Sequence, residues 1–291
     1  MNLQRLRYFL AVAEELHFGR AAEALHMAQP PLSQQIRQLE SELGVRLFDR
    51  TTRRVALTAA GEVLKVEAAR VVVAAESVER VMEEFRSGEG GVLRLAFVDS
   101  ASFEVMPRFL RAFRELWPKV RNDLQIMSSR NQLDALLTGE IDLGISRTSP
   151  AADDIMSQQF LDERLYFVVG AQHPAWELSE IQVRDIEHDA LIGFDRRLSP
   201  TLHEELQQLF ERVGSVYDPA IEATEYTTIL GLVAAGEGGA VVPNGVRNFS
   251  PQGVRYVPIE DAGASMSMYV NHRVDEPLRV VHHAVEVLTN F

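Results

Sequence analysis

Four polar side chains between residues 33 and 38 share one face if this segment is helical: Ser33, Gln34, Arg37 and Gln38. An apolar set recurs on the other face at i, i+4, i+7 and i+11: Leu32, Ile36, Leu39 and Leu43. The apolar set predicts a helix that packs inward and leaves the polar face exposed. Hydroxyl, amide and guanidinium groups on such a face can read base edges and hold phosphates. The pattern therefore predicts contact with DNA.

A second helical pattern precedes this one and is separated from it by a short break. Phe18, Ala22 and Leu25 recur at i, i+4 and i+7, and residues 26 to 29 interrupt the period. Two short helices joined in this way are typical of a helix-turn-helix. A third helix would complete the small core, because four residues near the N-terminus share one face: Leu3, Leu6, Leu10 and Ala13.

The helix-turn-helix gives a specific set of expected DNA contacts: Arg20, Gln29, Pro30, Pro31, Ser33, Gln34 and Arg37. Gln29 and Gln34 can read adenine edges, and Arg37 can bind guanine or phosphate. Pro30 and Pro31 suit the first turn of a helix and can contact thymine methyl groups. Two such helices in a dimer would require an inverted-repeat operator.

A wing is expected after the second helix. Gly44 ends the helical pattern, and residues 45–48 and 54–57 read as two short strands around a polar turn. Arg50, Arg53 and Arg54 lie in or beside this turn. They could be solvated, but beside a DNA-reading helix we expect them to contact the phosphate backbone near the minor groove.

The charge distribution agrees with DNA contact in the N-terminal segment alone. The whole chain has a formal net charge of −13, yet residues 1–60 hold 8 arginines against 6 acidic residues, a net of +2. The remaining 231 residues therefore carry −15. An acidic body repels DNA, so contact should be confined to the basic head.

Length and composition restrict the class of protein. A chain of 291 residues exceeds the usual size of one domain, so two domains are expected. Disulfides are excluded because the chain has no cysteine. No secretory core begins the chain and no run of 18 apolar residues follows, so we expect a cytoplasmic protein without a membrane partner.

A long helix is predicted to follow the wing. Thr58 is a suitable N-cap for a helix over residues 59–86. Apolar residues in it alternate spacings of four and three: Leu64, Ala68, Val71, Ala75, Val78, Met82 and Phe85. This heptad seam predicts a dimer through the helix, although one amphipathic helix packed on its own domain is the alternative. Glycines among residues 87–91 predict a hinge.

Alternating strands and helices begin at Val92. Strands are expected at 92–98, 124–127 and 141–146, with helices at 103–116 and 132–137, which form a βαβαβ unit around a parallel sheet. A similar unit is expected from strands and helices at 165–169, 190–194, 201–213, 220–223, 227–235 and 240–242. A strand at 266–270 and a final helix at 277–288 should return to the first unit. Two such lobes would leave a cleft between them.

The sequence resembles the LysR-type transcriptional regulators over essentially its full length. The resemblance is concentrated in the head, in residues 6–9, 21–26, 29–36, 39–40, 43–44, 47–50 and 57–61. It implies an all-α winged helix-turn-helix at 1–58, a linker helix at 59–87 and a hinge at 88–91. It also implies a periplasmic-binding-protein-like effector domain at 92–291, of two Rossmann-like α/β lobes, 92–161 with 269–291 and 162–268. The family implies a tetramer, an activator or repressor role and contact with RNA polymerase.

Within that family the body looks most like the branch that responds to aromatic breakdown products such as benzoate and muconates. Residues 95–100, 141–147 and 231–238 carry this resemblance. It implies no cofactor but an effector carboxylate in the cleft, at these positions: Val98, Asp99, Ser100, Ser129, Arg147, Pro200, Thr201 and Leu202. The residues themselves agree, since Ser100 and Ser129 follow strand ends and Thr201 opens a helix.

Asp99 departs from the pattern of that branch, which has a small uncharged residue there. A carboxylate would repel an anionic effector, so Asp99 either pairs with Arg147 or indicates a hydroxylated or less acidic ligand. Arg196 and Arg197 could supply positive charge on the opposite side of the cleft. A family member with a non-aromatic or uncharged effector is therefore the alternative. The two serines could also be simple helix caps.

Other classes of protein fit the sequence less well. A solute-binding protein shares the bilobed body but would need an export signal and no winged head. An enzyme would need a nucleophile with its base or a metal site, and residues 98–102 lack the glycines of a nucleophile elbow. Neither an enzyme nor a metal site is predicted.

Overall fold

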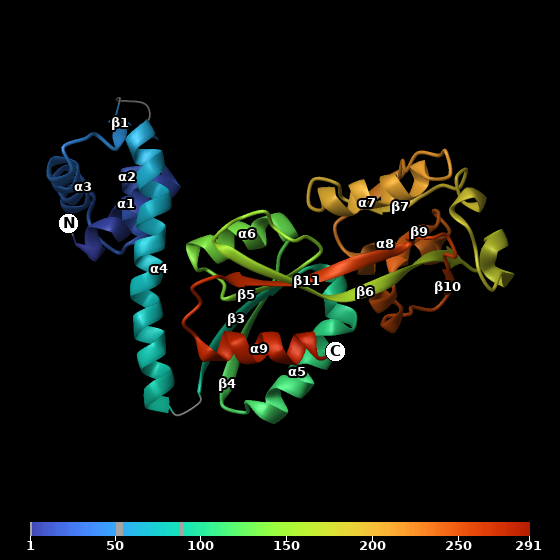
Figure 1. Cartoon of the computed structure of the whole chain (residues 1–291). Helices are drawn as coiled ribbons and strands as arrows, with labels where there is room; N and C mark the ends of the chain where they lie inside the picture. The colour runs from blue at the N-terminus through green and yellow to red at the C-terminus, as the bar shows by residue number, and fades with distance from the viewer. Residues whose placement is uncertain (1, 51–54, 88–89) are drawn as a thin grey trace. The chain divides into compact units, whose positions relative to one another are not determined.

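The chain folds into two compact units, Met1–Arg86 and Ser87–Phe291. The computed structural model in Figure 1 describes residues 2–50, 55–87 and 90–291. Within them, no helix is both long enough and apolar enough to span a membrane.

Three helices form the first part of unit 1: α1 (Leu3–Glu15), α2 (Phe18–Ala24) and α3 (Gln29–Leu43). Capping interactions and a left-handed glycine mark the ends of these helices. The Asn2 side chain accepts the Arg5 backbone N–H at the start of α1. The ring of His17 caps α2, and α3 ends at Gly44 in the left-handed conformation, with φ of 70°.

The core between these helices matches the expected apolar faces with one exception. Leu32, Ile36 and Leu39 of α3 are fully buried together with Phe9 of α1. Leu43, expected to continue this stripe, is 38% exposed. It is the last residue of α3, and the inward stripe ends one turn earlier, at Leu39.

The wing consists of β1 (Phe48–Arg50) and β2 (Val55–Leu57), which pair antiparallel. The prediction of a strand from Val45 is wrong, because β1 begins three residues later. The Glu40 carboxylate accepts the backbone N–H groups of Leu47 (2.9 Å) and Phe48 (3.2 Å), which holds this stretch against α3 instead. Arg53 and Arg54 lie outside the described residues.

The long helix α4 (Ala59–Ser87) forms as predicted, with the Thr58 hydroxyl accepting the Gly61 backbone N–H at 3.0 Å. The assignment of Leu64 and Ala68 to a seam facing a partner is wrong, because both pack into the core of their own head. Ala68 is only 1% exposed. Ala75 is half-buried, whereas Val71, Val78 and Met82 are exposed; the Phe85 side chain lies outside the description.

The first lobe of unit 2 is the predicted βαβαβ arrangement. Parallel strands β3 (Gly91–Phe97), β4 (Val120–Ile126) and β5 (Leu143–Ser146) alternate with α5 (Val105–Leu116) and α6 (Ser129–Thr138). A 3-10 turn, η1 (Asp99–Phe103), follows β3. The C-terminal helix α9 (Arg279–Thr289) lies beside α5 on one face of the sheet, and α6 covers the other (Figure 1).

Two long antiparallel strands join the lobes, β6 (Ile155–Gly170) and β11 (Ser265–Arg273). They belong to a seven-stranded sheet of order β10-β6-β11-β5-β3-β4, with β9 also paired to β6. Their register shifts between Met268 and Tyr269, at the position expected for the lobe boundary. The shift is a bulge, which bends and twists a strand pair where it passes from one lobe to the next.

The second lobe departs from the predicted parallel sheet. Its strands β9 (Ala240–Pro243) and β10 (Val254–Pro258) pair antiparallel with β6, and only β7 (Ile192–Phe194) and β8 (Ile221–Ala223) pair parallel. Strand β10 was not predicted. Helices α7 (Pro200–Glu211) and α8 (Tyr226–Ala235) and three 3-10 turns complete the lobe, η2 (Pro174–Glu177), η3 (Val183–Asp185) and η4 (Asn244–Asn248).

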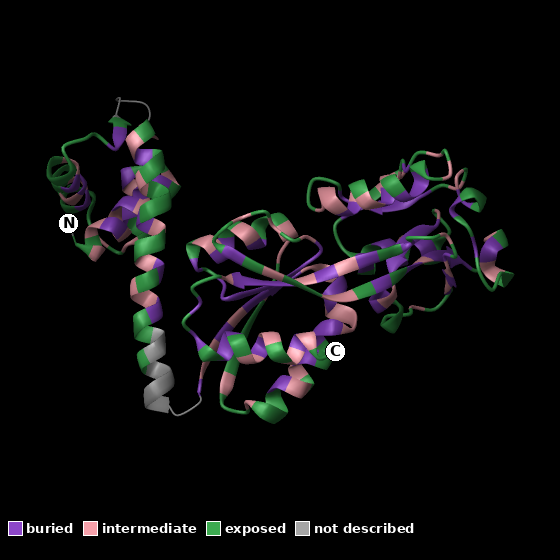
Figure 2. Cartoon of the chain, viewed as in Figure 1, coloured by how far each residue is buried: buried purple, intermediate pink, exposed green. Residues whose placement is uncertain are grey.

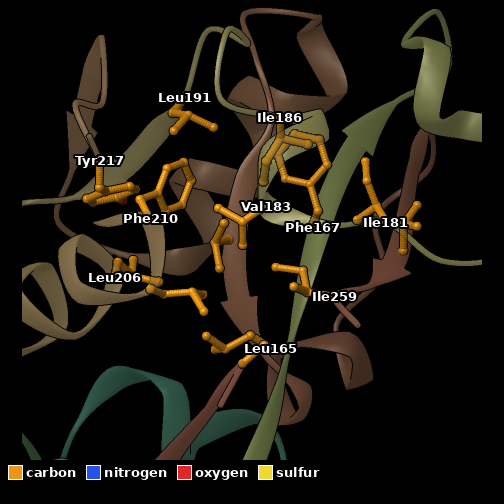
Figure 3. Close-up of a cluster of buried hydrophobic side chains, with 14 of the residues drawn as sticks. Leu165, Phe167, Ile181, Val183, Ile186, Leu191, Leu206, Phe210, Tyr217 and Ile259 are labelled. Atoms are coloured by element: carbon orange, nitrogen blue, oxygen red, sulfur yellow. The ribbon is translucent and has the colours of Figure 1, made fainter. Parts of the chain in front are cut away.

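A dense apolar core holds α7 against β6 (Figure 3). Leu206 and Phe210 of α7 belong to one buried cluster with Leu165 and Phe167 of β6, and Val183 lies between the two phenylalanines (Figure 3). This packing fixes the position of α7, whose first turn faces the cleft described below.

Candidate DNA interface and effector cavity

The outward face of α3 has the expected polar character. Gln29, Pro30, Pro31, Gln34 and Arg37 are exposed, and Ser33 is half-buried. Figure 2 shows this exposed face turned away from the other helices of the head. The prolines occupy the first turn of α3, where the missing N–H groups have no intrahelical partner to lose.

Arg37 and Arg20 are held in place by neighbouring groups. Arg37 donates from Nε to the Ser33 carbonyl at 3.3 Å, one turn earlier on α3. Arg20 donates from Nε to the Glu15 carboxylate at 2.8 Å, at the end of α1. Both guanidinium groups remain exposed, so the contacts orient them without burying their charge. Arg50 is the last residue of β1, opposite Val55.

A cavity of about 270 Å³ lies between the two lobes of unit 2. The first lobe contributes one wall: Val98, Asp99, Ser100, Ile126, Met127, Ser128, Asn131 and Arg147. The second lobe contributes the other: Phe194, Leu198, Ser199, Leu202, Thr224, Tyr226 and Met266. The cavity therefore lies at the carboxyl ends of β3, β4 and β5, where ligands of open α/β sheets bind.

Arg147 is at the centre of this site but its hydrogen-bonding capacity is used within the protein. It is buried, and it forms an ion pair with the buried carboxylate of Glu163 on β6. Its Nη2 and Nε donate to Ser100 Oγ at 2.9 and 3.3 Å. Its Nη1 donates to the carbonyls of Met266 and Ser267 at 3.4 Å each. Arg147 lines the cavity as expected, and its hydrogen bonds also connect β5, β6, β11 and η1.

Asp99 does not pair with Arg147, which was one of the two expectations for it. Its Oδ2 accepts the backbone N–H of Tyr226 at 2.9 Å, so it caps α8 from the opposite lobe. Burial is the main cause that raises the pKa of Asp99, and the hydrogen bond from Tyr226 opposes that rise.

Two of the expected hydroxyl and amide contacts are displaced by one residue. Ser129 is not on the cavity wall; its Oγ accepts the backbone N–H of Arg147 at 3.2 Å, and Ser128 lines the cavity instead. Likewise Ser199 and Leu202 line it, whereas Pro200 and Thr201 do not. A one-residue error at a helix start changes which side chain faces inward, because successive residues point about 100° apart.

The remaining wall residues were not predicted from sequence. Phe194 ends β7, Tyr226 opens α8 and Met266 lies on β11. Phe194 and Tyr226 lie at the ends of their elements, but such positions are common in the second lobe, and Met266 lies inside β11. Arg197, proposed as a source of positive charge, is neutralised by Asp195, with Nη2 to Oδ2 at 2.6 Å. Hydrogen bonds from Arg197 lower the pKa of Asp195 to about 2.

Comparison with known proteins identifies the family. The helix-turn-helix of bacterial regulatory proteins of the lysR family matches residues 3–62, and the LysR substrate binding domain matches residues 86–290. The chain belongs to the LysR family of transcriptional regulators. As a LysR regulator it binds DNA through the head and carries an effector-binding domain, and the predicted fold is confirmed.

Similar LysR proteins span nearly the whole chain. The regulator AlsR of Bacillus subtilis (strain 168) is 34% identical and covers 99% of this chain and 95% of its own. BenM of Acinetobacter baylyi is 31% identical over 99% and 95% of the two chains. Such relatives are named as transcriptional regulators, so the prediction that the chain is no enzyme is confirmed.

Full-length CbnR, solved in complex with its target DNA, gives the structural comparison. It superposes on this chain with a TM-score of 0.75 and 27% identity, and covers 100% of this chain and 99% of CbnR. The likeness therefore includes the head, the linker helix and both lobes.

Proposed function

We propose that this LysR regulator binds an inverted-repeat operator as a dimer through α3 and the wing, and that a small molecule in the interlobe cavity changes this binding. The exposed polar face of α3 in a head similar to that of DNA-bound CbnR is the observation that carries the proposal. The ligand can act only by binding two arrangements of the protein with different affinity. A cytoplasmic tetramer that contacts RNA polymerase is part of the same proposal, supported by family membership.

The lining of the cavity supports the expectation that the effector contains an aromatic ring. One wall of the cavity is apolar and consists of Phe194, Tyr226, Leu202 and Met266. The cavity volume of about 270 Å³ has room for a small ring compound. The carboxylate part has less support, because Arg147 is committed to Glu163.

The DNA part of the proposal is tested with Arg37→Ala. Loss of one guanidinium contact in the major groove should weaken operator binding by about 1–3 kcal/mol, roughly 5- to 150-fold. Fluorescence anisotropy with a labelled promoter fragment at fixed salt measures this change. Arg184→Ala removes the same charge from an exposed position on the acidic body and should leave affinity within about twofold. Equal affinity of the two variants would contradict the assignment of α3 as the reading helix.

A further inference from the structure

The charges around the interlobe cavity do not balance. Arg147 is the single cationic side chain among its lining residues, all of which the structure describes, and it is paired with Glu163. Five hydrogen bonds to Ser100, Glu163, Met266 and Ser267 occupy the guanidinium. An anionic ligand would therefore compete with Glu163 for this group.

Asp99 leaves one carboxylate oxygen available to the cavity. Its Oδ2 accepts the Tyr226 backbone N–H, and within the described residues no group donates to its Oδ1. The same bond occupies the first amide of α8, which an anionic ligand could otherwise have used. Asp99 is thus a half-buried carboxylate without a cationic partner in the described structure.

Two hydroxyl groups on the same wall can donate to a ligand. Ser100 Oγ accepts two N–H groups from Arg147 and keeps its own proton, which it can donate to a ligand. Ser128 Oγ accepts the Asn131 backbone N–H at 3.4 Å and likewise keeps its proton. The wall of the first lobe therefore combines a carboxylate acceptor, two hydroxyl donors and the apolar side chains of Ile126 and Met127.

We infer that the effector carries a protonated amine that binds the Asp99 carboxylate, on a small apolar body that fills the space between Phe194, Leu202 and Met266. This inference rests on the proposed function, since it concerns the ligand of the same cavity. An ammonium group supplies the missing counter-charge and a donor to Oδ1, and leaves both the Arg147–Glu163 pair and the Asp99 cap of α8 intact.

Three probes that differ in charge but share one ring test this inference: benzylamine, benzyl alcohol and benzoate. Their affinities for the full-length protein are measured by ligand-observed NMR at pH 7.5. We expect benzylamine to bind at least tenfold more tightly than benzoate. Asp99→Asn keeps an acceptor for the Tyr226 N–H but removes the charge, so it should weaken benzylamine at least tenfold and change benzyl alcohol by less than twofold.

A second variant locates the binding. Leu198 lies on the cavity wall and is 42% exposed, so Leu198→Trp can fill the cavity with little risk to folding. It should abolish binding of benzylamine. The inference is overturned if benzylamine does not bind at millimolar concentration, if it binds Asp99→Asn as well as wild type, or if benzoate binds most tightly.

These outcomes separate the inference from the proposed function. If benzoate binds most tightly of the three probes and Leu198→Trp abolishes this binding, the inference of an amine is overturned and the effector cavity remains supported. Binding of any probe that Leu198→Trp does not change would place the ligand elsewhere and overturn both. The DNA part is tested independently by Arg37→Ala.

Discussion

The buried ion pair between Arg147 and Glu163 determines which hydrogen bonds each of these charged groups can make. The guanidinium of Arg147 and the carboxylate of Glu163 are about equally buried, and each has further hydrogen bonds that satisfy it. Glu163 Oε1 also accepts the backbone N–H of Gly245 at 2.8 Å, at the start of η4. The pair therefore links the cavity wall to the second lobe, and its value depends on both partners being present.

Removal of Glu163 should be strongly destabilising. Glu163→Ala leaves the Arg147 charge buried without compensation and the Gly245 amide without its acceptor, which should lower the free energy of unfolding by about 3–5 kcal/mol. Urea denaturation followed by circular dichroism measures the loss. The exposed pair of Arg164 and Glu260 is the control, and Glu260→Ala should cost less than about 1 kcal/mol. Equal losses would show that the buried pair contributes no more than a surface one.

Part of this site could be predicted from the sequence. Val98 ends a predicted parallel strand, and Asp99, Ser100 and Arg147 follow such strand ends, which lie together at one edge of a parallel sheet. Glu163 could not be predicted, because it lies on the part of β6 that was not recognised as a strand. A pairing between residues on separate elements is determined by tertiary structure, which local patterns do not contain.

At the level of secondary structure, some elements lie so close together that a side chain would not fit between them, and glycine is required there. Gly61 lies in the first turn of α4, where a Cβ atom would be 2.2 Å from the Leu47 carbonyl oxygen and 2.8 Å from Leu57 Cδ2. The absence of a side chain therefore lets α4 cross the chain next to the wing. Gly231 in the middle of α8 is the opposite case, because a Cβ atom there would have no neighbour within 4 Å.

The two glycines give opposite predictions for the same substitution. Gly61→Ala should destabilise the protein by about 1–3 kcal/mol, since the backbone at Leu47 must move. Gly231→Ala should stabilise it by about 0.5–1 kcal/mol, because alanine is the better helix former and meets no obstacle. Thermal unfolding of both variants under one buffer condition measures the difference. A stabilising Gly61→Ala would mean that α4 does not pass so close to Leu47.

The elements that sequence patterns missed share a physical cause. Residues 155–164 of β6 include the polar run Ser157-Gln158-Gln159, so their apolar period is weak although they pair with β11 along nine registered positions. Strand β10 contains Pro258 and alternates only partly. Helices were predicted better, since α4, α7 and α8 carry the 3.6-residue period and recognisable starts.

At the level of the whole molecule, three apolar side chains of α4 are exposed in the part of the chain that the structure describes. Val71, Val78 and Met82 are 46%, 62% and 56% exposed and belong to the seam predicted for a dimer, whereas Leu64 and Ala68 of that seam pack inward. The proposed dimer would therefore use the outer part of the predicted seam, Val71, Val78 and Met82. A second copy of α4 is the occupant that the proposed operator symmetry requires.

A charge in this outer seam should separate the dimer. Val78→Glu would place a carboxylate in an apolar contact, and we expect the dimer dissociation constant to rise at least tenfold, or about 1.4 kcal/mol. Sedimentation velocity at micromolar concentration measures the change, and circular dichroism checks that α4 remains helical. Val216→Glu, at an equally exposed position of the body, is the matched control and should sediment as wild type. Operator affinity should fall for Val78→Glu alone, because a monomer reaches one half-site; an unchanged dimer would exclude this face of α4 as the interface.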